Sequence, residues 1–96
     1  MLELRPTCEN CNKALPPASV AAMICSFECT FCAECVEEVL ENVCPNCGGG
    51  FVPRPIRPRE ALQKNPATTT VTHKPVDVAL LSDMQERYEE IEPEDR

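Results

Sequence analysis

The sequence predicts a small metal-stabilised α+β module followed by a largely extended tail. Eight cysteines form four close pairs within residues 8–47, and no cysteine lies outside that block. Good helix formers are concentrated in residues 32–42, which predicts one helix between the last two pairs. Four prolines interrupt residues 53–66. Regular structure is therefore expected to end near Val52, and the module is predicted to span residues 1–52.

A module of this size needs a bound metal ion or disulfides to stabilise its fold. About fifty residues bury too little apolar surface to offset their chain entropy without a metal ion or disulfides. Charged residues interrupt the first fifteen positions, and no apolar segment of a secretory signal follows. We therefore expect a cytoplasmic protein in a reducing compartment, where repeated Cys-x2-Cys pairs indicate metal sites. No apolar stretch has the length that spans a bilayer.

Short strands and one helix are expected around the cysteine pairs. Residues 1–5 alternate in part between apolar and polar, and the apolar run 20–24 leads directly into Cys25, so each predicts a short strand. The helix over 32–42 has Thr30 as its expected N-cap. Its predicted inward stripe consists of Cys32, Cys35, Val36, Val39 and Leu40.

The spacing within the pairs is typical of tetrahedral thiolate sites. A Cys-x2-Cys turn points both sulfurs at one metal ion, and the residue after it often needs a positive φ. Gly48 and Asn12 stand at that position after two of the pairs, and both tolerate such a backbone. Four pairs supply the ligands for two zinc ions. From spacing alone the pairs can group in an interleaved order, in a sequential order, or as one site with spare thiols.

The order Cys8-x2-Cys11-x13-Cys25-x3-Cys29-x2-Cys32-x2-Cys35-x8-Cys44-Pro45-x-Cys47 resembles the RING family. Cys29 stands where that family commonly has histidine, so the match is to its all-cysteine variant. The resemblance implies a treble-clef module with short β-hairpins, one helix and interleaved ligands. It implies site one from Cys8, Cys11, Cys32 and Cys35, and site two from Cys25, Cys29, Cys44 and Cys47.

The departures from this family concern activity more than fold. RING ubiquitin ligases usually carry an apolar residue within the first pair, where this chain has Glu9 and Asn10. They often have a tryptophan before the last pair and a basic residue after it, whereas this chain has no tryptophan and has Gly48. The opening residues 1–8, with Phe27, Phe31 and the Cys44–Gly49 segment, are also similar to small bacterial cysteine-rich proteins with no assigned function. That resemblance implies a bacterial cytoplasmic protein.

The remainder divides into a Pro/Arg-rich extended linker, 53–75, and an acidic tail, 76–96. Residues 67–75 are expected as an edge strand or as unordered chain, with the lone His73 at the surface. The tail contains a candidate amphipathic helix, whose apolar seam is formed by Leu81, Met84, Tyr88 and Ile91 and extended by Val76 and Leu80. The seam can pack on the module, dimerise or bind a partner, and the sequence does not choose among these. The candidate partner surfaces are this seam and the loop 16–24, and of the two we favour the seam.

Charge and ligand chemistry narrow the function classes. The net charge is −7, and residues 1–52 carry two basic and seven acidic side chains, so nucleic-acid binding is not expected. Closed four-thiolate sites leave no open position for catalysis, and one histidine makes no catalytic triad. We expect a non-enzymatic zinc protein that binds an unidentified protein partner and neither nucleic acid nor membrane. The alternatives are a RING-type ubiquitin-ligase-like module and a redox or metal-sensing protein.

An iron–sulfur protein is the weaker form of the redox alternative. Residues Cys29, Cys32 and Cys35 are spaced like part of a ferredoxin run. In bacterial ferredoxins the following Cys-Pro comes after three residues, whereas eight separate Cys35 from Cys44. This spacing favours zinc.

Overall fold

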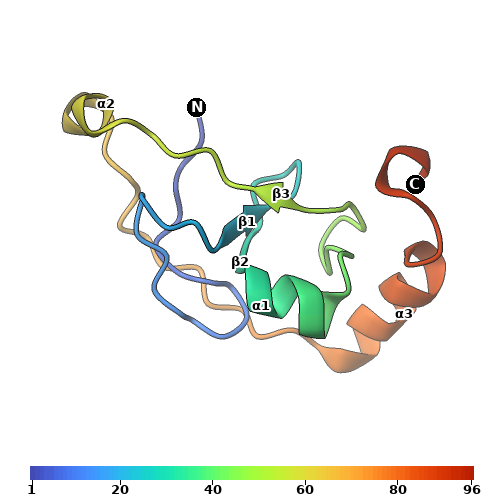
Figure 1. Cartoon of the computed structure of the whole chain (residues 1–96). Helices are drawn as coiled ribbons and strands as arrows, with labels where there is room; N and C mark the ends of the chain where they lie inside the picture. Colours follow the sequence, from blue (N-terminus) through green and yellow to red (C-terminus); the bar gives the residue numbers. More distant parts are fainter.

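A three-stranded antiparallel sheet lies at the centre of the molecule (Figure 1). The structure is a computed structural model that describes residues 1–96. Strand β1 (Ala22–Ile24) is the middle strand, between β2 (Thr30–Cys32) and β3 (Val52–Pro53). Residue Ile24 pairs with Thr30 on one side and with Val52 on the other. With the helix that follows β2, the sheet makes the small α+β fold that the sequence predicts.

The predicted helix is present but shorter, and five of its eight residues form a turn that is wider than an α-helix. It comprises α1 (Ala33–Cys35) and the π-helical turn η1 (Val36–Leu40). Thr30 is not the N-cap, because it belongs to β2 and Cys32 precedes the first turn. The Ala33 N–H instead donates to the Ala21 carbonyl at 2.8 Å. The helix ends at Leu40 because Glu41 and Asn42 are left-handed, with φ of 52° and 60°.

The wider turn also changes which side chains face the core. Val36 and Leu40 are buried as predicted, whereas Val39 is 41% exposed. Hydrogen bonds that span five residues shift the angular spacing of side chains, and the inward stripe predicted from α-helical spacing therefore fails at Val39.

The first residues do not form the predicted strand. Leu4 is buried and has a φ of 56°, which interrupts an extended backbone. The first pairing of this region is an isolated bridge between Thr7 and Ala14, on either side of the first cysteine pair. This bridge closes the loop that carries Cys8 and Cys11.

The first residues of the segment predicted as a linker are in contact with the module. Arg54 is 4% exposed, and its guanidinium donates to the carbonyls of Arg5, Leu15 and Pro16 at 2.9, 3.2 and 3.1 Å. Helix α2 (Arg59–Lys64) lies within the segment, after Pro58 at its N-cap position. Buried carbonyls need donors, and Arg54 supplies them from outside the cysteine block.

The tail helix forms, and its seam packs on the module. Helix α3 (Val78–Tyr88) begins after Asp77, whose side chain accepts hydrogen bonds from the N–H groups of Ala79 and Leu80. Leu81 is 5% exposed within the main core cluster, and Val76 packs against that cluster. The seam is therefore already covered in part by this chain. A short turn, η2 (Pro93–Asp95), follows α3.

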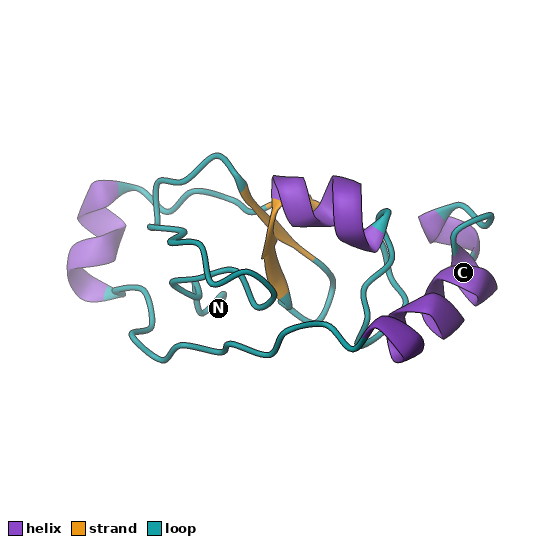
Figure 2. Ribbon diagram, turned by 90° about the horizontal axis from the view of Figure 1, so that it is seen from below, coloured by secondary structure: helices purple, strands orange, loops and turns teal.

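Residues 65–77 run along one side of the module from α2 to α3, without forming a strand (Figure 2). The backbone N–H groups of Thr68 and Lys74 donate to the carbonyls of Glu3 and Glu9 at 2.9 and 2.8 Å. The segment predicted as an edge strand or unordered chain is thus extended and attached to the module at separate points.

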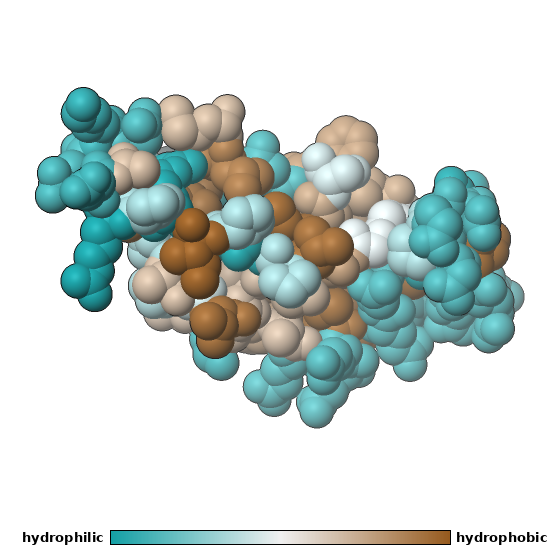
Figure 3. All heavy atoms as spheres, turned by 45° about the horizontal axis from the view of Figure 1, so that its top comes forward, coloured by the Kyte–Doolittle hydropathy of each residue, from teal (hydrophilic) through white to brown (hydrophobic).

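The core is built largely from the cysteines. Six of the thirteen residues in the main buried cluster are cysteines. Phe31 and Phe51 meet edge to face, with ring centroids 5.5 Å apart. Figure 3 shows apolar side chains gathered over the central part of one face, with hydrophilic atoms at both ends. No helix combines the length and the apolar character that a membrane span requires.

Candidate metal centre

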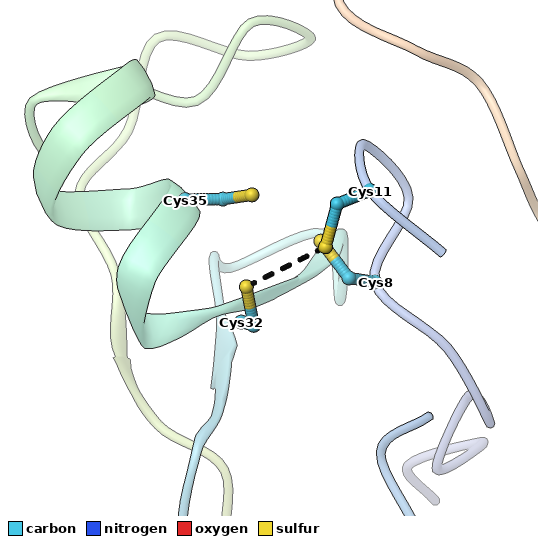
Figure 4. Close-up of side chains that lie close together, drawn as sticks. All are labelled: Cys8, Cys11, Cys32 and Cys35. Carbon is cyan, nitrogen blue, oxygen red and sulfur yellow. Dashed lines mark hydrogen bonds between the residues drawn. The ribbon is translucent and has the colours of Figure 1, made fainter. Parts of the chain in front are cut away.

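The first cysteine cluster joins the N-terminal loop to the start of the helix. Cys8 and Cys11 come from the loop closed by the Thr7–Ala14 bridge, Cys32 ends β2, and Cys35 ends α1. Their four sulfurs all lie within 4.8 Å of one another and converge on one point (Figure 4). The Sγ atoms of Cys11 and Cys32 are 3.8 Å apart. In a zinc tetrahedron with Zn–S bonds of about 2.3 Å, the sulfurs are separated by about 3.8 Å.

The second cluster joins the loop after β1 to the turn before β3. The sulfurs of Cys25, Cys44 and Cys47 lie within 4.8 Å of one another. Cys29 is outside that group, but its thiol interacts with those of Cys44 and Cys25. The structure therefore places three of the four predicted site-two cysteines together and the fourth beside two of them. All eight cysteines are free thiols.

The turn at the last pair has the backbone that the sequence predicts. Gly48 has a φ of 80°, and its N–H donates to the Cys44 carbonyl at 2.8 Å. The Gly49 N–H points toward the Cys47 sulfur at 3.4 Å. At the first pair, Asn12 has a φ of 63° and its N–H donates to the Cys8 carbonyl at 2.9 Å. These bonds to carbonyls close the two turns. Backbone N–H groups also reach a sulfur in each turn, that of Cys47 in the last pair and that of Cys8 in the first, and such donors stabilise thiolate.

The grouping of the pairs is interleaved. The first pair lies with the third, and the second lies with the fourth, which matches the order that the RING resemblance implies. Spacing alone also allowed a sequential grouping. The sheet decides between them, because β1 and β2 are antiparallel neighbours. Their pairing places Cys25 and Cys32 at opposite ends of the two strands, so each joins a different cluster.

Each cluster contains one thiol that ionises more easily than its neighbours. A hydrogen bond from the Cys44 thiol lowers the pKa of Cys29 to about 5, and that same hydrogen bond together with burial raises the pKa of Cys44. Burial raises the pKa of Cys25 to about 11 and that of Cys35 to about 12. Burial opposes ionisation of Cys8 too, but backbone N–H groups outweigh it and lower its pKa. A divalent cation would replace the protons that the other thiols retain.

Two asparagine side chains donate hydrogen bonds to the cysteine clusters, a role that was not predicted from the sequence. The Asn10 side-chain amide donates to the Cys35 sulfur, and that of Asn46 donates to the Cys29 sulfur, both at 3.4 Å. Each asparagine stands third in a Cys-x-Asn-Cys turn, and each donates to the other pair of its own cluster. The asparagine that recurs at the same position of both turns is the feature of the sequence that could have indicated this role. Such second-sphere donors orient ligands and adjust their basicity.

A buried carboxylate lies beside the second cluster. Glu9 is 4% exposed, and its Oε2 accepts from the Thr30 N–H at 3.2 Å and from Arg5 Nη1 at 3.4 Å. Its Oε1 accepts from the Asn46 amide at 3.4 Å. Burial raises the pKa of Glu9, and the negative charge of the nearby Cys29 thiolate raises it further. In the sequence, Glu9 stands out only as a departure from the ligase pattern.

The lone histidine is a surface residue, as predicted. His73 is exposed, and its Nε2 lies 3.3 Å from the Asn10 carbonyl oxygen. The two cysteine groups contain no histidine. They hold the residues that could bind metal ions, and their all-thiolate donor set suits a soft or borderline cation.

Residues 1–57 match the family described as "Protein of unknown function (DUF1272)". That stretch contains all eight cysteines, both asparagines that donate to sulfur, and Arg54. The chain is also 59% identical over 75 residues to the uncharacterized protein R02474 of Rhizobium meliloti (strain 1021). The shared region covers 78% of this chain and 89% of that bacterial protein. No solved structure matches the chain.

Proposed function

The chain belongs to the DUF1272 family, whose function is unknown, and we propose that it is a zinc-binding protein with two structural sites. In this proposal it has no enzymatic activity and works by binding another protein. The observation that carries the proposal is the position of the two cysteine clusters within the core itself. A metal ion bound there would hold the fold together.

Zinc is the metal that these residues suit best. Four thiolates at tetrahedral corners are its usual structural ligands, and the separation of the Cys11 and Cys32 sulfurs equals the edge of such a tetrahedron. A thiolate set would also accept an iron–sulfur cluster. The eight residues between Cys35 and Cys44 are the reason that we prefer zinc. We place the protein in the cytoplasm, because a reducing compartment keeps cysteine pairs available to metal.

The proposed architecture is a RING-like, treble-clef module. Its support is the interleaved grouping of the pairs, together with the helix that begins between the third pair's two cysteines and continues beyond them. Ligase activity does not follow from this architecture. Glu9 and Asn10 stand within the first pair, where RING ligases usually carry an apolar residue. Residues 74–77 and Leu80 of the chain's own tail face the first and last cysteine turns across a cavity that Glu9, Pro45 and Asn46 also line. A carrier enzyme would find that space occupied.

The absence of catalysis is proposed from coordination chemistry. Catalytic zinc keeps one position for water or substrate, whereas four thiolates close the coordination shell. For partner binding, the tail seam that the sequence favoured is a poor candidate, because Leu81 is buried and Tyr88 lies against Gly48. The loop before β1 stays available, and its Val20 side chain is 85% exposed.

Metal stoichiometry tests the proposal. Native mass spectrometry with elemental analysis, on full-length protein purified under reducing conditions, should find two zinc ions per chain. The variants Cys11→Ser and Cys47→Ser assign the ions, since these are the least buried cysteines of their clusters. Each variant should lose one zinc and keep the other. One zinc in the wild type would reduce the protein to a single structural site, and bound iron with visible absorption would overturn the zinc assignment.

A further inference from the structure

Residues 73–77, which we call the strap, cross the module between the two cysteine turns. The strap is the part of the 65–77 segment nearest α3 in Figure 2. With Leu80 it closes one side of a cavity of about 80 Å³, whose other walls are Glu9, Phe31, Pro45 and Asn46. A chain segment held in this place is in contact with residues of both cysteine turns at once.

The strap is held largely by the two asparagines that also donate to sulfur. The Val76 N–H donates to Asn10 Oδ1 at 3.0 Å, and Lys74 Nζ donates to Asn46 Oδ1 at 3.4 Å. The nitrogen of each amide donates to a cysteine sulfur of the adjacent cluster. One planar amide therefore connects each cluster to the strap, with its nitrogen toward the sulfur and its oxygen toward residues 74–76.

Backbone contacts complete the attachment. The Lys74 N–H donates to the Glu9 carbonyl at 2.8 Å, and the His73 ring lies against the Asn10 carbonyl. Glu9 and Asn10 are the two residues between Cys8 and Cys11. Their backbone is positioned by the same turn that aims the first pair at its metal, so the strap is built on the geometry of cluster one.

From these contacts we propose that metal binding docks the strap, with Asn10 and Asn46 as the positioning residues that couple each cluster to it. Thiolates held by a metal ion accept the amide N–H and fix each side chain so that its oxygen faces the strap. Loss of the metal from a cluster frees its sulfurs from their fixed positions, which loosens the amide that each sulfur orients and the part of the strap that this amide holds. Release uncovers the groove formed by Glu9, Phe31 and Pro45. This inference rests on the metal binding proposed above.

Hydrogen exchange on the zinc-loaded full chain tests the coupling without unfolding the module. In Asn10→Ala, the Val76 amide should exchange at least fivefold faster than in the wild type. Asn46→Ala is the matched control, because it removes the same group from the other cluster and leaves the Val76 bond to Asn10 intact. The amides of Gly48 and Cys44 report that the turn at the last pair remains folded in Asn10→Ala.

Loss of the metal from one cluster provides a second test of the coupling. Cys11→Ser, which should keep only the zinc of cluster two, should expose the Val76 amide while the Gly48 amide stays protected. By linkage, Val76→Pro removes the N–H that Asn10 accepts and should weaken zinc binding at cluster one several-fold, as measured by equilibrium competition with a chelator. Val71→Pro, which changes an exposed residue earlier in the same segment, should leave that affinity unchanged.

The outcomes separate this inference from the proposed function. The coupling would be overturned if the wild type binds two zinc ions but the Val76 amide is equally protected in the wild type, in Asn10→Ala and in Cys11→Ser. That result would leave the zinc proposal standing. A wild-type chain that binds no metal would overturn both. Should Asn10→Ala fail to fold, Val76→Pro still tests the inference, and a zinc affinity at cluster one equal to that of the wild type would contradict it.

Discussion

Replacing Arg54 with methionine should destabilise the zinc-loaded protein strongly, although this residue lies beyond the cysteine block. Its guanidinium donates to three main-chain carbonyls, those of Arg5, Leu15 and Pro16. These carbonyls belong to the N-terminal segment and to the loop before β1, and Arg54 directly follows β3. Methionine keeps most of the side-chain volume and removes every donor.

The size of the expected destabilisation follows from the hydrogen bond that each carbonyl loses. A hydrogen bond from a charged donor contributes about 1.5–3 kcal/mol, but a carbonyl that water can reach recovers part of that loss. Only the bond to Leu15 is fully buried, whereas those to Arg5 and Pro16 are partly exposed. The buried Nε–H has no protein partner, and its removal offsets some of the cost. We expect unfolding free energy to fall by about 3 kcal/mol.

Denaturant unfolding at fixed free zinc measures the change. Arg59→Met is the matched control, because the Arg59 side chain is exposed and makes no hydrogen bond or ion pair in the structure. This variant should lower the free energy of unfolding by less than about 0.5 kcal/mol. Arg57→Met should lie between them, since Arg57 donates to the carbonyls of Leu2 and Asn65 from a less buried position. If Arg54→Met unfolds at the same denaturant concentration as Arg59→Met, the assignment of Arg54 to the folded unit is wrong.

Three further predictions concern the core and the thiols. Leu81→Ala should lower the free energy of unfolding by about 2–4 kcal/mol and speed hydrogen exchange in α3. Leu80→Ala, at a side chain that is 62% exposed, should change neither quantity, and equal effects of the two variants would contradict the packing of the seam. Chelation of the metal should abolish cooperative unfolding and NMR dispersion, because cysteines form about half of the main core cluster, and dispersed spectra without metal would refute that dependence. Zinc binding at pH 7 should release protons, measurable with a pH indicator, because the pKa of Cys25 is raised to about 11 and its thiol is protonated there. Cys29, with a pKa lowered to about 5, is already thiolate, so fewer than eight protons should appear and zinc affinity should fall as pH falls; an affinity independent of pH between 5 and 8 would contradict this assignment.

The parts that could be predicted from the sequence are those that depend on near neighbours. Two residues between cysteines are enough to form a turn that aims two sulfurs at one point, and Gly48 has the positive φ expected of its position. Helix α3 was predictable for the same reason, because its cap, Asp77, and its apolar spacing are both local. The helix after Cys32 was predicted correctly as an element. Its π-helical half, which turns Val39 outward, depends on packing that no propensity encodes.

The tertiary structure decided how the pairs group and what surrounds them. The antiparallel pairing of β1 with β2 separates Cys25 from Cys32, and spacing alone had left that choice open. The sequence places Arg54 in the Pro/Arg-rich extended linker, whereas its three carbonyl partners in the structure lie 38 to 49 residues away. The strap contacts of Asn10 and Asn46 span 66 and 28 residues. Local chemistry determines which atoms can bind a metal, whereas hydrogen bonds between distant segments depend on the path of the whole chain.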